Sequence, residues 1–155
     1  MYNTIKGISK RAYATAKRRG KYVDPEDCKK YLQCELNEYW DAVEAGKPTN
    51  FWRDIVSEAA RMSDAEFIEM YNKRVHNTAD DELADILITT ATWIEAIALQ
   101  RESEGNPYQT KRDVELMFAV GPIQYVLDQL DGNEDRERLV NILYLKLRYN
   151  EIRKD

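Results

Sequence analysis

The sequence predicts an all-α protein, and its composition and hydrophobic periodicity support this. Proline and glycine number only 4 and 6 among 155 residues, so the chain has few positions at which short elements would turn. Hydrophobic residues make up 43% of the chain, and in its long segments they recur at spacings of three and four. Long helices fit these features better than a meander of short strands. The length suits one domain, residues 1–155.

Gly, Pro and capping residues set the expected boundaries of the helices. The first helix should stop at Gly20, and the second should begin at Asp24-Pro25, where Asp can cap and Pro can occupy the first turn. Asn50 and Ser63 are candidate caps for two shorter helices. We therefore expect helices at 4–19, 25–45, 50–60, 64–74, 79–103, 112–130 and 134–153, the sixth kinked at Gly121-Pro122.

Two of these helices carry apolar faces that predict the core. On the second helix a single stripe is formed by Leu32, Leu36, Tyr39 and Val43. The stretch 86–99 of the fifth helix contains only one charged residue, Glu95. A helix that is apolar nearly all round belongs at the centre of a bundle or in a subunit interface.

The charge distribution argues against a general nucleic-acid binder. The net charge is −5, and seven of the 23 basic residues but none of the 28 acidic ones precede Asp24. The body of the chain is therefore strongly acidic. Residues 1–24 form a basic N-terminal helical segment, which is either a solvated helix face or a surface that meets phosphate.

Cysteine content and hydropathy predict a cytoplasmic protein that is not inserted in a membrane. Cys28 and Cys34 lie six residues apart in one expected helix and point to different faces, so we expect two reduced thiols that serve in packing. The sequence has no signal-peptide core and no run of about 18 apolar residues.

Two pairs of acids carry the candidate chemistry. Glu35 and Glu38 form one pair, and Glu82 and Asp85 form the other. A spacing of three places both carboxylates of a pair on one helix face, within about 6 Å of each other. If the apolar stripes of the two helices pack together, all four acids meet along one edge of the contact.

Four carboxylates at one edge would repel each other without a cation. Two unit charges about 5 Å apart repel by roughly 3 kcal/mol at an effective dielectric near 20. An all-oxygen site without His or Cys suits Mg²⁺, with Mn²⁺ as a substitute. Either pair alone would read as a solvated helix face, and it is the two together that favour a metal site.

At these residues the chain resembles the MazG-like all-α nucleoside triphosphate pyrophosphohydrolases. That superfamily carries E-x-x-E on one helix and E-x-x-D on a later one, which here read E35-L-N-E38 and E82-L-A-D85. Its members often show a lysine, Tyr-Asn and an arginine in the last helix, as in Lys146, Tyr149-Asn150 and Arg153. The resemblance covers about 25–153 and is weakest over 47–77.

The resemblance implies a helical bundle of the all-α NTP pyrophosphatase type. It implies hydrolysis of a nucleoside triphosphate, deoxy or non-standard in the housecleaning members, to monophosphate and pyrophosphate. The four acids would hold Mg²⁺, with one of them orienting the attacking water. Lys146 and Arg153 would clamp phosphate, and Asn150 would hydrogen-bond the nucleotide. Such enzymes are homodimers or homotetramers.

Several other residues read as structural, and two other classes stay open. Asp41 is expected to be exposed, Asp81 to cap the fifth helix or to support the metal ligands, and His76 to pack or cap. The three tryptophans are assigned to core or interface packing. A non-catalytic helical interaction module and a phosphoribosyl-ATP pyrophosphohydrolase-like enzyme remain alternatives. A di-iron bundle requires Glu-x-x-His pairs, and the single histidine follows Lys73 at that spacing.

Overall fold

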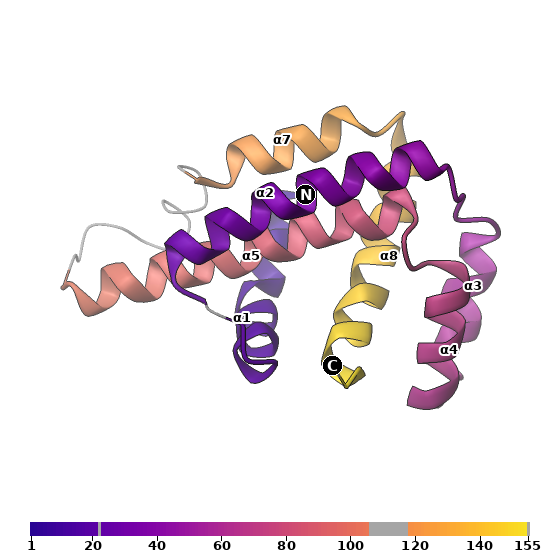
Figure 1. Cartoon of the computed structure of the whole chain (residues 1–155), viewed down its shortest axis with the longest axis horizontal. Coiled ribbons are helices and arrows are strands. Elements are labelled where there is room, and N and C mark those ends of the chain that lie inside the picture. The colour runs from indigo at the N-terminus through magenta and orange to yellow at the C-terminus, as the bar shows by residue number, and fades with distance from the viewer. Residues whose placement is uncertain (22, 106–117, 155) are drawn as a thin grey trace. The chain divides into compact units, whose positions relative to one another are not determined.

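The computed structural model describes all residues except 22, 106–117 and 155, and the described part of the chain is all-α, without strands. Figure 1 labels its helices. They are α1 (Tyr2–Arg18), α2 (Pro25–Ala45), α3 (Trp52–Ala59), α4 (Asp64–Arg74), α5 (Ala79–Ser103), α7 (Val120–Asp128) and α8 (Asn133–Ile152). The all-α prediction is confirmed. The part of the predicted sixth helix at 112–117 lies outside the described residues.

The chain divides into two compact units, and each contains parts of α2 and α5. One unit comprises 1–34 and 86–129, and the other comprises 35–85 and 130–155. Both pairs of acids fall within the second unit, as does α8 with the predicted nucleotide-side residues. The division by itself does not test whether the chain folds as one domain, which stays a prediction.

The first unit is built on apolar helix faces. In α1 the buried residues Ile5, Ile8 and Ala12 lie on one face, opposite the basic one. The stretch of α5 beginning at Ile86 is buried almost throughout, as its apolar composition predicted. The rings of Trp93 and Phe118 pack in a T-shaped arrangement, with 5.7 Å between ring centroids.

The second unit is organised around α8, on which α3 and α4 both pack. Its buried positions include Leu139, Leu143 and Leu147, which recur every fourth residue. Arg148 of α8 donates hydrogen bonds to the carbonyl oxygens of Ala59 and Met62, at 2.7 and 2.9 Å. These bonds satisfy carbonyls at the C-terminal end of α3 and tie α8 to the connection between α3 and α4.

The capping predictions have mixed outcomes. Ser63 forms a capping box with Glu66 at the start of α4, and the Asp24 carboxylate accepts the Asp27 N–H at 3.0 Å at the start of α2. The prediction that Asn50 caps α3 is wrong. The residue at that cap is Phe51, in the left-handed region at φ 56°, without a side-chain hydrogen bond.

Three further details differ from the sequence predictions. Val43 is exposed, whereas Ala42 is buried, so the buried face of α2 is rotated from the predicted stripe toward the acids. Pro122 lies in the first turn of α7, where its missing N–H costs no hydrogen bond, and the described helix begins at Val120, whereas the sequence predicted its start at 112. Cys28 and Cys34 are both free, as predicted, but only Cys28 is buried.

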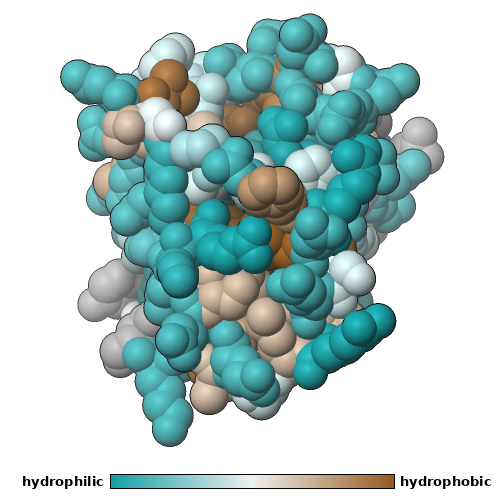
Figure 2. All heavy atoms as spheres, turned by 90° about the vertical axis from the view of Figure 1, so that its right-hand side faces the viewer, coloured by the Kyte–Doolittle hydropathy of each residue, from teal (hydrophilic) through white to brown (hydrophobic). Residues whose placement is uncertain are grey.

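The surface is mainly hydrophilic on the face that Figure 2 shows, with hydrophobic residues visible between the polar ones. None of the described helices is both long and apolar enough to span a membrane.

Candidate metal centre

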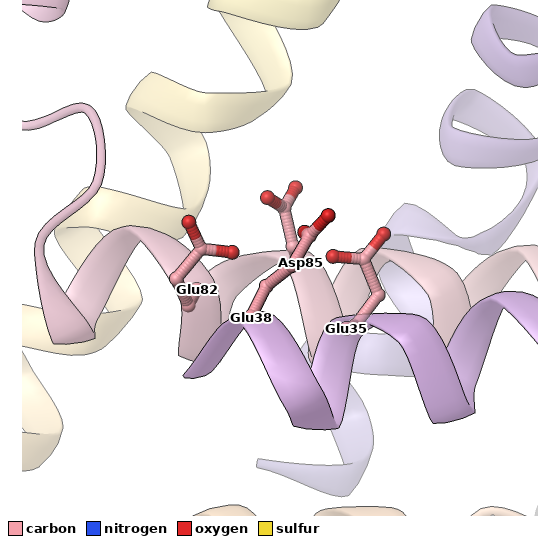
Figure 3. A group of neighbouring side chains, drawn as sticks. All are labelled: Glu35, Glu38, Glu82 and Asp85. Atoms are coloured by element: carbon pink, nitrogen blue, oxygen red, sulfur yellow. The ribbon is translucent and has the colours of Figure 1, made fainter. Parts of the chain in front are cut away.

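The structure brings the four predicted acids together in the second unit. α2 carries Glu35 and Glu38, and α5 carries Glu82 and Asp85, with the two helices side by side at this point (Figure 3). One carboxylate oxygen from each residue can be chosen such that all four lie within 4.8 Å of one another. The meeting of the acids that the helical spacing predicted is therefore observed.

The cluster extends from the protein interior to solvent. Glu82 is buried, with 6% of its surface exposed, Glu35 and Asp85 are half-buried, and Glu38 is exposed. Because the buried face of α2 is rotated toward the acids, Glu35 is closer to the buried positions of that helix than the predicted apolar stripe would have placed it. The arrangement gives the cluster a buried side at Glu82 and an open side at Glu38.

Glu82 carries the clearest sign of electrostatic stress. Burial, together with the charges of Asp85 and Asp81, raises the pKa of Glu82 to about 8. Its Oε2 atom is buried and has no hydrogen-bond partner within the part of the chain that the structure describes. A buried carboxylate oxygen without a donor is costly, and a cation would remove that cost.

The donor set fits a hard divalent cation. It consists of carboxylate oxygens from two helices, in a spread compatible with ligands around a single centre. Neither His nor Cys belongs to the group, so the site lacks the ligands that zinc prefers. The four residues form a carboxylate cluster that could hold a metal ion.

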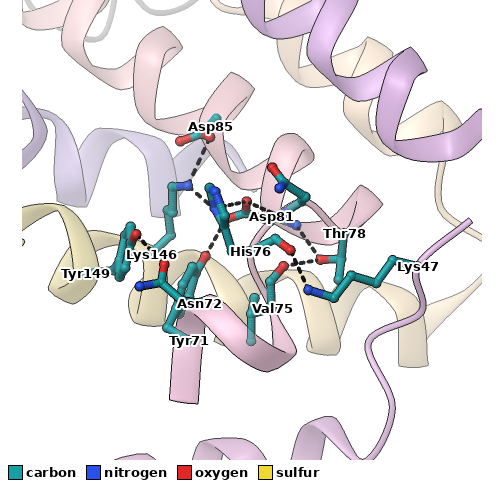
Figure 4. A network of polar contacts seen from close by, with 11 residues as sticks. Lys47, Tyr71, Asn72, Val75, His76, Thr78, Asp81, Asp85, Lys146 and Tyr149 are labelled. Atoms are coloured by element: carbon teal, nitrogen blue, oxygen red, sulfur yellow. Dashed lines mark hydrogen bonds and ion pairs between the residues drawn. The ribbon is translucent and has the colours of Figure 1, made fainter. Parts of the chain in front are cut away.

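Lys146 lies at the buried side of this cluster. Its Nζ atom is 2.8 Å from Asp81 Oδ1 and 3.1 Å from Asp85 Oδ2 (Figure 4), and the residue is 2% exposed. Burial opposes the charged form, but the two carboxylates outweigh it and raise the pKa of the ammonium. Lys146 is thus a buried ammonium between two carboxylates and not a solvated basic side chain.

Asp81 is the centre of a buried polar network. Its Oδ1 accepts hydrogen bonds from the Tyr71 hydroxyl and Lys146, and its Oδ2 accepts the backbone N–H of Asn77 at 3.0 Å. His76 Nδ1 lies 3.4 Å from the same Oδ2. Burial raises the pKa of Asp81, but these neighbours outweigh it and lower the pKa to about 2, so the residue is a carboxylate at neutral pH.

The start of α5 explains why Asp81 is held so firmly. Thr78 performs the capping: its Oγ1 accepts the Asp81 N–H at 3.1 Å, and its carbonyl accepts the Glu82 N–H at 3.2 Å. Asp81, for which the sequence left open a capping role or a role in supporting the metal ligands, uses its carboxylate on Asn77, Tyr71 and Lys146. The same helical turn therefore fixes Asp81 and the adjacent Glu82.

The remaining predicted nucleotide-side residues are only partly solvent-exposed. Asn150 is buried, and its Oδ1 has no hydrogen-bond partner within the described residues. Arg153 follows the end of α8 in extended conformation, with its guanidinium carbon 5.1 Å from the Tyr149 ring centroid. α8 thus carries Lys146 and Asn150 one turn apart on a buried face.

The structure also shows the surroundings of the residues that the sequence analysis assigned to structural roles. Asp41 is exposed, as expected, and lies outside the acidic group. Of the tryptophans, which were assigned to core or interface packing, Trp52 is buried, whereas Trp40 is 55% exposed and is not a core residue. Sequence reasoning missed Tyr71, because nothing local signals that a tyrosine ten residues earlier donates to Asp81.

Comparisons with protein-family models, with curated proteins and with solved structures each found no match. The resemblance to the MazG-like enzymes therefore rests on the motif residues alone, and the functional conclusions drawn from it are proposals.

Proposed function

We propose that the protein is a Mg²⁺-dependent nucleoside triphosphate pyrophosphohydrolase of the MazG-like all-α type. The observation that carries the proposal is the convergence of Glu35, Glu38, Glu82 and Asp85, whose oxygens lie within 4.8 Å of one another. The same residues form the two motifs that resemble that superfamily, so the spacing in the sequence and the geometry support one site.

The four acids would hold Mg²⁺, with Mn²⁺ as a substitute. When bound, the ion neutralises phosphate charge and lowers the pKa of water. Hydrolysis joins a water oxygen to phosphorus and breaks a phosphoanhydride bond, which yields monophosphate and pyrophosphate. One of the four carboxylates orients that water and takes its proton.

The nucleotide would be bound on the α8 side of the cluster. Lys146 supplies a fixed positive charge beside Asp85, 3.1 Å from Oδ2, which offsets phosphate charge. The Oδ1 of Asn150, which has no hydrogen-bond partner among the residues that the structure describes, offers an acceptor for a nucleotide hydroxyl or amine. Arg153, at the end of α8, is the second phosphate-binding cation. We further propose that the enzyme works as a homodimer or homotetramer.

The proposal is tested by pyrophosphate release from a panel of canonical, deoxy and non-standard nucleoside triphosphates, with phosphoribosyl-ATP included. We expect release with Mg²⁺ or Mn²⁺ and none with a chelator present. Glu82→Gln should lower turnover by at least about a hundredfold, because it removes a charged ligand, while the circular dichroism spectrum stays unchanged.

Asp41→Asn is the matched control, since Asp41 is an exposed acid of α2 outside the cluster. It should retain full activity. Full activity of Glu82→Gln would refute the mechanism. A protein that neither binds Mg²⁺ nor releases pyrophosphate from any triphosphate would support the non-catalytic helical module instead.

A further inference from the structure

The Lys146 ammonium lies between two carboxylates with different surroundings. Asp81 is fully buried, whereas the side chain of Asp85 is 19% exposed and belongs to the acidic cluster. The shorter contact, 2.8 Å, is to Asp81, and the longer, 3.1 Å, is to Asp85. One cation is thus shared between a carboxylate inside the protein and a candidate metal ligand.

A lysine that close to Asp85 would compete with a divalent cation for the same carboxylate. Two positive charges near one oxygen pair repel each other, and an ammonium paired to Asp85 alone would favour the metal-free state. Asp81 offers the ammonium a second partner that cannot move away, since both of its oxygens are engaged by groups from α4, α8 and the segment before α5 (Figure 4).

Asp81 is poorly suited to bind the metal itself. The contacts to Tyr71, Asn77 and Lys146 occupy both of its oxygens, and it is not a member of the group whose oxygens converge. Asp81 and Glu82 are neighbours in the sequence, but their carboxylates have different surroundings. The carboxylate of Asp81 contacts Lys146 of α8, whereas that of Glu82 lies near the acids of α2.

We propose that Asp81 is a positioning residue, which anchors the Lys146 ammonium on the buried side of the cluster so that Asp85 remains able to bind a divalent cation. This inference rests on the metal-binding part of the proposed function. It assigns to Asp81 an effect on metal affinity that is exerted through Lys146.

A double-mutant cycle on metal binding tests this assignment. Mg²⁺ and Mn²⁺ affinities are measured by calorimetry for the wild type, Asp81→Asn, Lys146→Gln and the double variant. Asp81→Asn should weaken binding on the order of tenfold, because Lys146 then pairs with Asp85 alone. In the Lys146→Gln background the same substitution should cost at least about fivefold less.

Asp80→Asn is the matched control. Asp80 is also a buried acid in the first turn of α5, but its ion pair is with Arg138, at 2.9 Å, and not with Lys146. The Asp80→Asn variant shows how much metal affinity is lost when one negative charge is removed from this helical turn. We expect that loss to be smaller than the loss in Asp81→Asn and the same with or without Lys146.

Equal losses from Asp81→Asn in both backgrounds would overturn the proposal, because a merely structural Asp81 acts without Lys146. The experiment measures metal affinity and not turnover, so it can support the role of Asp81 even in a protein that hydrolyses no triphosphate. Conversely, an active enzyme that binds metal can still show that Asp81 has no such role. Absence of any Mg²⁺ or Mn²⁺ binding by the wild type would overturn both this inference and the proposed function.

A second measurement uses only folded wild-type protein, in case Asp81→Asn does not fold. The ammonium resonance of Lys146 is followed by ¹H–¹⁵N NMR while Mg²⁺ is added, with Lys146→Gln for assignment. An ammonium that stays on Asp81 should keep a slowly exchanging signal at saturation. Loss of the signal on Mg²⁺ binding would show that Asp81 does not hold Lys146, and the proposal would fail.

Discussion

Glu82 shows at the level of a single residue how burial and neighbouring charge raise the pKa of a carboxyl group in a cluster that could hold a cation. Its pKa, raised to about 8, means that the metal-free protein holds a proton on this side chain at neutral pH. The folded state therefore binds that proton more tightly than the unfolded chain. As a consequence, this residue adds to metal-free stability below about pH 4.5, and the contribution is lost as the pH rises through about 8.

The pH dependence of metal binding follows from the same shift. A divalent cation must displace the Glu82 proton, so Mg²⁺ affinity should rise by up to about tenfold per pH unit between pH 6 and 8 and level off above that. Calorimetric titrations across pH 6 to 9 measure this dependence. Glu82→Gln has no proton to lose and should show a flat profile. A wild-type affinity that does not change over this range would contradict the assignment.

At the scale of elements, α4 begins with a complete capping box. The Ser63 side chain accepts the Glu66 N–H at 3.3 Å, and the Glu66 carboxylate accepts the Ser63 N–H at 3.2 Å. This start fixes the helix that carries Tyr71 to the buried network, so the cap contributes to the position of a residue two turns away.

Loss of this cap should have a measurable cost. Ser63→Ala should lower the free energy of unfolding by about 1 kcal/mol, because the backbone N–H of Glu66 at the helix start loses the Ser63 hydroxyl that accepts its hydrogen bond. Urea denaturation measures the change. Ser57→Ala is the control, since Ser57 is an exposed serine inside α3, where alanine is a better helix former. An equal loss in both variants would argue against a capping effect.

On the scale of the whole molecule, metal binding should appear as stability. The four acids lie close together on α2 and α5, where their like charges repel each other, and a bound cation would link the two helices. At a Mg²⁺ concentration about a hundredfold above its Kd, linkage predicts roughly 2.7 kcal/mol of stabilisation. For a chain of this size that corresponds to a rise in Tm of about 5–10 °C.

Thermal melts with Mg²⁺, and with KCl at equal ionic strength, test this effect. KCl should give little change, since it screens the charges without occupying the site. Glu82→Gln should abolish most of the Mg²⁺-specific rise. The alternative of a non-catalytic module with merely solvated acids predicts no difference between the two salts, and that result would count against the metal centre.

The sequence predicted the helices closely because their boundaries are local. Gly20, Gly46 and Ser63 stop or start helices through their own backbone and side-chain properties, and the structure ends or begins α1, α2 and α4 beside them. The cap of α3 could not be predicted in this way. There Phe51 adopts a left-handed conformation that its residue type disfavours.

The sequence by itself determined that Glu35 pairs with Glu38 and Glu82 with Asp85, because two residues three apart on a helix lie on the same face. The spacing of four between Lys146 and Asn150 likewise places these two residues on one face of α8. Only the tertiary structure decided what they face. Lys146 meets Asp81 across 65 residues of sequence, and the lysine that was expected on the phosphate side is a buried ammonium between two carboxylates. Such a contact depends on how α4, α5 and α8 pack, and local spacing carries no information about that packing.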